Sequence, residues 1–144
     1  MTSKTTPVLY TIGYEKATME GFLKTLTDNE IGILVDIRSH PKAKRAEFSG
    51  PILRKSVECA GMEYLHIPEL GMPKEGLYRA RLGKLDKAWD IYEEQVLAKQ
   101  AGQLQWIVDM ATRKKVCLMC YEHGAFQCHR HLTAQATKLN VHHL

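Results

Sequence analysis

The sequence predicts an α/β fold in which helices cover both faces of a mostly parallel sheet of about five strands. Short apolar segments typical of buried strands alternate along the chain with segments whose apolar residues recur at helical spacing. The strand segments are almost continuously apolar, as expected for parallel strands that are covered on both faces. The chain has 144 residues and no linker or low-complexity tract, so we expect a single α/β domain over residues 1–144.

The first half of the chain supplies three of the expected strands and two helices. A helix is predicted over residues 18–29, with Thr18 in the N-cap position and an apolar stripe along one side. A second helix begins near Pro51, which suits the first helical turn, and ends before Gly61. The strands expected in this half are residues 8–12, 33–37 and 62–66.

The second half begins with a segment rich in helix-breaking residues. Residues 68–83 contain two prolines and three glycines, so we expect a long loop, which in a compact domain is more often functional than idle. Residues 85–112 follow helical spacing and should form two helices that are broken near Gly102. The remaining expected elements are a strand over 115–119, a helix over 130–139 and a short strand over 141–144.

Composition narrows the class of protein and its location. No segment approaches the ~18 consecutive apolar residues of a membrane span, and the first residues, MTSKTTPV, lack the apolar region of a signal peptide. We therefore expect a cytoplasmic protein without a membrane partner, whose four cysteines are reduced thiols. The net charge of +4 permits an anionic ligand without requiring one. The sequence identifies neither a cofactor nor an oligomeric state.

Chemically versatile residues follow the expected strands at the point where each strand ends. Parallel strands place these ends at one edge of the sheet, where α/β folds bind their ligands. The sequence therefore predicts a polar crevice at that edge. The catalytic candidates are Asp36, Glu122, Cys120 and Cys128, and the ligand-binding candidates are Gly13, Tyr14, Arg38, Ser39, His129 and Arg130.

A small anion is the ligand that these residues favour. The planar guanidinium groups of Arg38 and Arg130 match phosphate and carboxylate groups, and a helix that starts near Arg130 would add free N–H groups and a positive dipole end. Asp36 ends an apolar strand, so its carboxylate needs a partner, which either arginine can supply. Asp36 then either caps the loop or acts with Glu122 in acid–base catalysis. We expect an enzyme that acts on a phosphate- or carboxylate-bearing molecule.

Two thiols lie within the same region. Cys120 directly follows the last buried residues of its strand, whereas Cys128 lies beside His129 and Arg130 near a helix start. Such a setting lowers the pKa of a thiol, so we expect Cys128 to be the more reactive of the two. Either thiol is a candidate nucleophile, and packing is the alternative role for both.

The thiols also suggest a redox or metal-binding module. Cys117, Cys120, Cys128 and His129 form the pattern C-x2-C-x7-C-H, whose side chains Zn²⁺ binds readily. Alternation along a strand, however, directs Cys117 and Cys120 to opposite faces of the sheet. For that reason the sequence alone assigns no metal ligand.

A nucleic-acid-binding or nucleic-acid-processing domain is a further alternative. Lys42, Lys44 and Arg45 form a short basic cluster after the second expected strand. The cluster lacks the interleaved aromatic residues of a surface that binds single strands. Nucleic acid is therefore not the favoured partner.

The chain resembles, nearly from end to end, the family called domain of unknown function 488, or DUF488. The matching segments are YTIGYE at 10–15, LVDIRSHP at 34–41, EF at 47–48, AGMEYLHIPELG at 60–71, LMCYE at 118–122 and CHR at 128–130. The resemblance implies an α/β fold and brings no settled activity. The positions that it marks are Gly13, Asp36, Arg38, Pro41, Cys120, Glu122, Cys128, His129 and Arg130. The chain departs from the family pattern at Tyr14 and Met72, and Cys117 is not part of that pattern.

Overall fold

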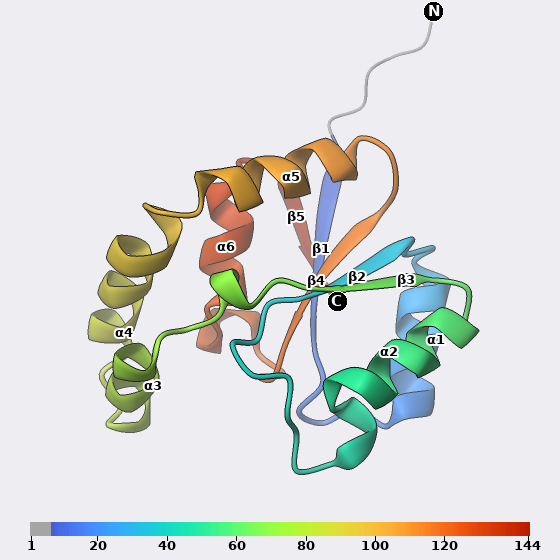
Figure 1. Cartoon of the computed structure of the whole chain (residues 1–144), viewed down its shortest axis with the longest axis horizontal. Coiled ribbons are helices and arrows are strands. Elements are labelled where there is room, and N and C mark those ends of the chain that lie inside the picture. The colour runs from blue at the N-terminus through green and yellow to red at the C-terminus, as the bar shows by residue number, and fades with distance from the viewer. Residues whose placement is uncertain (1–6) are drawn as a thin grey trace, which may run out of the picture.

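A computed structural model describes residues 7–144 and shows a five-stranded sheet, with strand order β3-β2-β4-β1-β5 and every neighbouring pair parallel (Figure 1). The predicted α/β fold is confirmed. The expectation about an export signal falls mostly on residues 1–6, which lie outside the described residues. The strands are β1 (Val8–Gly13), β2 (Ile33–Asp36), β3 (Glu63–His66), β4 (Val116–Cys120) and β5 (Asn140–His143).

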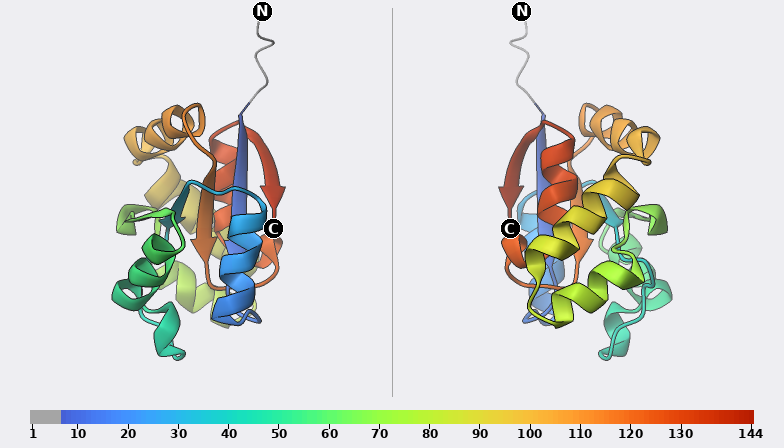
Figure 2. Two further views of the ribbon diagram at one scale, coloured as in Figure 1. Left: turned by 90° about the vertical axis from the view of Figure 1, so that its right-hand side faces the viewer. Right: turned by 90° about the vertical axis from the view of Figure 1, so that its left-hand side faces the viewer.

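Helices cover both faces of the sheet, as the two side views show (Figure 2). The α-helices are α1 (Met19–Asp28), α2 (Gly50–Cys59), α3 (Lys74–Arg81), α4 (Leu85–Tyr92), α5 (Ala101–Ala111) and α6 (Arg130–Ala136). The short 3-10 helices are η1 (Ala46–Phe48), η2 (Pro68–Leu70) and η4 (Ala125–Gln127), and η3 (Glu93–Leu97) is a π-helix. Within residues 7–144, none of these helices combines the length and the apolar character needed to cross a membrane.

Each face of the sheet has its own apolar core. On one face, α1 and α2 bury residues such as Phe22 and Leu53 against the sheet. On the other face, α4, α5 and α6 bury residues such as Tyr92 and Ile107. Successive residues of β4 alternate between the two cores, so that Cys117 belongs to the α1/α2 face and Cys120 to the other. The expectation that these two cysteines face opposite ways is confirmed.

Local signals set the ends of the first two helices as expected. The hydroxyl of Thr18 accepts a hydrogen bond of 3.0 Å from the backbone N–H of Gly21, which is the predicted N-cap of α1. Pro51 lies in the first turn of α2. Gly61 has a φ of +90° and follows the end of α2, a conformation that favours glycine.

The prediction of a long loop over residues 68–83 is wrong, because this segment contains η2 and α3. Pro73 precedes α3 in an extended conformation that suits a helix start. Gly76 lies inside α3, where a β-carbon would come within 2.3 Å of the Met72 sulfur, so this glycine permits close packing. Gly83 has a φ of +76° and ends the turn. The break expected near Gly102 is confirmed, and it falls at Gln100, just before α5.

The carboxyl ends of four strands meet at one edge of the sheet. Gly13 at the end of β1 is paired with Cys120 at the end of β4. Asp36 at the end of β2 is paired with Met119 on one side and with His66 at the end of β3 on the other. The predicted convergence of strand ends is therefore confirmed.

Candidate functional site

The sequence places the candidate residues in one crevice. In the structure they form two groups, one on each face of the sheet. The first group, called here the Asp36 cluster, lies on the α1/α2 face and contains Tyr14, Asp36, Arg38 and Tyr64. The second group, called the thiol cluster, lies on the α4/α5/α6 face and contains Cys120, Cys128 and His129. Both groups lie at the carboxyl edge of the sheet.

Asp36 is fully buried and forms a paired hydrogen-bond contact with Arg38. Oδ1 accepts from the Arg38 Nε at 2.9 Å and from its backbone N–H at 3.1 Å, and Oδ2 accepts from Nη2 at 2.7 Å. The hydroxyl of Tyr64 donates to Oδ2 at 2.5 Å. Arg38, rather than Arg130, is therefore the partner that this buried carboxylate needs. Because four donors fill its oxygens, Asp36 positions the guanidinium group and has no free lone pair for a proton.

Two tyrosine hydroxyls border the Arg38 guanidinium. Nη1 of Arg38 donates to the Tyr14 hydroxyl at 3.2 Å. Burial raises the pKa of Tyr14, although the adjacent guanidinium of Arg38 partly offsets this. Burial and the Asp36 carboxylate both raise the pKa of Tyr64. Both hydroxyls therefore stay protonated near neutral pH, and the Tyr14 hydroxyl, which accepts from Arg38, can still donate its own proton.

Tyr64 is a member of this cluster that the sequence analysis missed. Tyr64 can be recognised as a neighbour of Asp36 only when the register of the sheet is known, because that register pairs Asp36 with His66. Tyr64 precedes His66 by two residues and so lies on the same face of the sheet as Asp36. A correct prediction of the strand order, which places β3 beside β2, would have brought Tyr64 to Asp36.

The predicted ligand-binding residue Ser39, together with His66, holds the loop after β2 in place. The Ser39 hydroxyl donates to the Met72 carbonyl at 2.9 Å, and Nε2 of His66 donates to the Arg38 carbonyl at 2.6 Å. A β-carbon at Gly71 would lie 2.1 Å from the Ser39 hydroxyl oxygen, so the two backbones approach closely. Ser39 therefore connects the β2 loop to the segment before α3.

The basic cluster that suggested nucleic acid has a partly structural role. The guanidinium group of Arg45 donates to the carbonyls of Tyr14 and Ala17, and thereby fixes the loop between β1 and α1. Lys42 and Lys44 are exposed. Arg45 is therefore engaged by the fold and is not a free phosphate contact.

The thiol cluster is arranged around the His129 ring. Nδ1 of His129 lies 3.8 Å from the Cys120 sulfur and 3.8 Å from the Cys128 sulfur. Nε2 lies 3.1 Å from the Ile37 carbonyl oxygen. Because a carbonyl only accepts, Nε2 carries the ring proton, and Nδ1 has a lone pair available to the two thiols.

Burial acts in opposite directions on the pKa values of Cys128 and His129. It raises the pKa of the Cys128 thiol well above its ordinary value, and the adjacent Cys120 adds to this while His129 opposes it. The expectation of a lowered Cys128 pKa is therefore wrong. Burial would lower the pKa of His129, but Cys128, the Ile37 carbonyl and the Glu122 carboxylate outweigh it and raise that pKa.

The order of thiol reactivity changes accordingly. Cys59 is exposed, Cys120 retains 5% of its surface, and Cys128 retains only 1%. We expect an alkylating reagent at neutral pH to modify Cys59 first and Cys120 more slowly, and to reach Cys128 and Cys117 only when the fold opens. Mass spectrometry of peptides from a time course measures this order. Modification of Cys128 before Cys120 would contradict it.

Arg130 supports the loop after β4. Its side chain is fully buried, and it donates from Nε to the Thr11 hydroxyl at 3.2 Å, from Nη1 to the Glu122 carbonyl at 2.6 Å and from Nη2 to the His123 carbonyl at 3.2 Å. A β-carbon at Gly13 would lie 1.7 Å from the same Glu122 oxygen. Both residues therefore fix the position of this loop.

The Glu122 side chain has an unsatisfied carboxylate oxygen. Its Oε2 is buried and has no hydrogen-bond partner among residues 7–144. The carboxylate is close enough to His129 to contribute to the raised pKa of that ring. A buried oxygen without a donor is costly, so this atom marks a place where a bound group would be stabilising.

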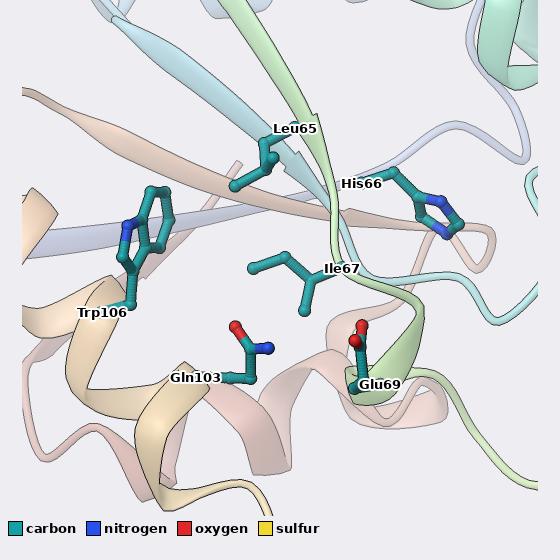
Figure 3. A pocket seen from close by; sticks show the side chains of 6 residues that line it. All are labelled: Leu65, His66, Ile67, Glu69, Gln103 and Trp106. Atoms are coloured by element: carbon teal, nitrogen blue, oxygen red, sulfur yellow. The ribbon is translucent and has the colours of Figure 1, made fainter.

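A cavity of about 220 Å³ lies beside the edge strand β3 (Figure 3). Trp106 and Gln103 of α5 face Leu65 and Ile67 across it, whereas His66 points to the other side of the strand. None of the predicted site residues lines this cavity. Its lining residues are Leu65, His66, Ile67, Glu69, Gln103 and Trp106.

Comparison with known proteins gives a family without an assigned activity. No curated protein and no solved structure matches the chain significantly. The family model described as domain of unknown function DUF488 matches residues 18–137. The match includes the Asp36–Arg38 pair and the whole thiol cluster. This chain therefore belongs to the DUF488 family.

Proposed function

We propose that the protein is an enzyme that acts on a small phosphate- or carboxylate-bearing molecule, which Arg38 binds at the carboxyl edge of the sheet. The observation that carries this proposal is the set of free donors around Arg38. Asp36 and Tyr14 engage three of the five guanidinium N–H groups, and the other two have no partner among residues 7–144.

The arrangement of these donors suits an oxyanion. Asp36 occupies the edge of the guanidinium formed by Nε and Nη2, which leaves one N–H on each of the two terminal nitrogens. Such a pair can bind two oxygens of a phosphate or carboxylate side by side. The Tyr14 hydroxyl, adjacent to Nη1, supplies a third donor.

The shape of the cluster favours a small ligand over a nucleic acid. Arg38 and Tyr14 retain only 6% and 4% of their surface. A single phosphate or carboxylate group can contact such recessed donors, whereas nucleic-acid binding relies on many exposed cations along a surface. Nucleic acid is therefore the weaker candidate.

The catalytic roles follow from which groups are free. Asp36 is saturated with donors and positions Arg38. Glu122 has an unpaired carboxylate oxygen, so it is the acid–base candidate. Cys120 is the more accessible thiol of the thiol cluster, and it is close enough to Tyr14 to contribute to the raised pKa of that hydroxyl.

Ligand-induced stabilisation tests the anion site. Inorganic phosphate, mononucleotides and small carboxylic acids are added separately, and the Tm is measured. A compound at ~100 times its Kd should contribute ~2.7 kcal/mol, which for a chain of this size raises the Tm by roughly 5 to 10 °C. Arg38→Lys keeps the charge beside Asp36 but lacks the planar pair of donors, so it should lose the rise.

Arg54→Lys is the matched control, because Arg54 is exposed on α2 and, within residues 7–144, its one ion pair is with Glu58. This variant should respond to the ligand as the unchanged protein does. A rise that survives in Arg38→Lys, or the absence of a rise with every compound, contradicts the proposed site. A compound that raises the Tm is then followed for turnover by NMR, where Glu122→Gln should retain binding but lose turnover.

A further inference from the structure

We propose that Cys120, Cys128 and His129 form a zinc-binding site with a fourth coordination position open to water or another ligand. Its three ligands differ from Arg38 and Tyr14, which would bind the anion, and metal binding does not depend on anion binding. The two sulfur atoms and a ring nitrogen all lie within 4.8 Å of one another. Thiolate and imidazole are the ligands that zinc prefers in proteins.

The spacing of the three atoms suits a tetrahedral ion. Bond lengths of ~2.3 Å to sulfur and ~2.0 Å to nitrogen place two tetrahedral ligands ~3.5 Å apart. Nδ1 of His129 lies 3.8 Å from each cysteine sulfur. Only small shifts of these side chains would therefore bring all three ligand atoms to bonding distance of one ion.

The His129 ring already has the tautomer of a zinc ligand. Zinc-bound histidines donate their other ring N–H to a carboxylate or a backbone carbonyl, which fixes the tautomer. Here Nε2 is hydrogen-bonded to the Ile37 carbonyl at 3.1 Å, so Nδ1 carries the lone pair; it lies 3.8 Å from each sulfur, and Nε2 lies 3.9 Å from the Cys120 sulfur. The ligating nitrogen is thus preset by the fold.

Glu122 supplies an independent observation. Its buried Oε2 has no donor among residues 7–144, and Glu122 follows the proposed ligand Cys120 by two residues. A zinc-bound water is a donor of the kind that this oxygen lacks. Three protein ligands with one open position are typical of catalytic zinc sites, in which a nearby carboxylate accepts a proton from the bound water.

Metal analysis of the untagged protein tests this site. Protein purified under reducing conditions without chelators should contain about one zinc ion per chain. Inductively coupled plasma mass spectrometry measures this ratio. After zinc removal, Co²⁺ should bind in its place and give rise to a thiolate-to-cobalt charge-transfer band and the intense visible bands of a tetrahedral site. Cys120→Ser and His129→Gln should abolish stoichiometric binding. Cys59→Ser and Cys117→Ser are the matched controls and should retain it.

Protection of thiols in the unchanged protein gives a test that does not rely on the folding of variants. Zinc should prevent alkylation of Cys120 and Cys128 in a partially denaturing buffer, and a chelator should restore it, whereas Cys59 should react in both cases. Failure of the reduced protein to bind zinc or cobalt overturns the proposal. Zinc binding that persists in a folded Cys120→Ser variant also overturns the proposal, as does alkylation of Cys120 and Cys128 that zinc does not slow. The anion response at Arg38 is measured on metal-free protein, so the two proposals can fail separately.

Discussion

Gly13→Ala should lower the free energy of unfolding by roughly 3 to 5 kcal/mol. The added β-carbon would lie 1.7 Å from the Glu122 carbonyl oxygen, which is far inside contact distance. The backbone of the loop after β4 would have to move. That carbonyl also accepts a 2.6 Å hydrogen bond from the buried Arg130, so the movement would remove an acceptor from a buried charge.

Urea denaturation followed by circular dichroism measures this effect, with Gly102→Ala as the control. Gly102 lies in the first turn of α5, and nothing stands within 4 Å of its hypothetical β-carbon. Alanine there should stabilise the protein by up to about 1 kcal/mol, because glycine loses more backbone entropy in a helix. A Gly13→Ala protein as stable as the unchanged protein would mean that this loop adjusts freely.

Asp36→Asn should also destabilise the protein by roughly 3 to 5 kcal/mol, because it leaves the buried Arg38 guanidinium without a counter-charge. The amide also places an NH2 group where one carboxylate oxygen accepts from Arg38 and Tyr64. The N–H groups of the new amide would then face the N–H of Arg38 and the hydroxyl of Tyr64, with no acceptor between them. Equilibrium unfolding measures the loss.

Asp28→Asn is the matched control, since Asp28 forms an exposed pair with Lys24 one helical turn away. Its removal should cost at most about 0.5 kcal/mol. Replacing both members of the buried pair, as Asp36→Leu with Arg38→Met, should restore much of the stability that either single change removes. A small effect of Asp36→Asn would show that the pair is not energetically coupled.

Much of the fold follows from the pattern of apolar residues. The strands and most helices were predicted because buried strands are short apolar runs and helices show a period of 3.6 residues. The helix α3 was missed because two prolines and three glycines lie in residues 68–83. Gly76, in the middle of that helix, looks like a breaker in the sequence and serves close packing in the structure.

The division of the site into two faces was not predictable in the same way. All residues of β2 and β4 are buried, so neither strand shows the polar alternation that reveals which side chains share a face. The sequence could bring Asp36 and Cys120 to one edge but could not separate them across the sheet.

The acidity of Cys128 illustrates a second limit. Arg130 is two residues away in sequence, which suggested a positive charge beside the thiol. In the structure its guanidinium group donates to Thr11 and to the carbonyls of Glu122 and His123 instead. Burial of Cys128 then dominates, and burial depends on packing between segments that are distant in the chain.

The strand order also has a consequence for biosynthesis. Both neighbours of β1 in the sheet, β4 and β5, are translated after residue 115, and β4 separates β1 from β2. While the ribosome is still making the earlier residues, β2 and β3 can pair, but β1 has no strand to join. Contacts between such distant segments form slowly. We therefore expect the apolar first strand to lack its sheet neighbours through most of synthesis, so that a chaperone would protect the nascent chain until β4 emerges.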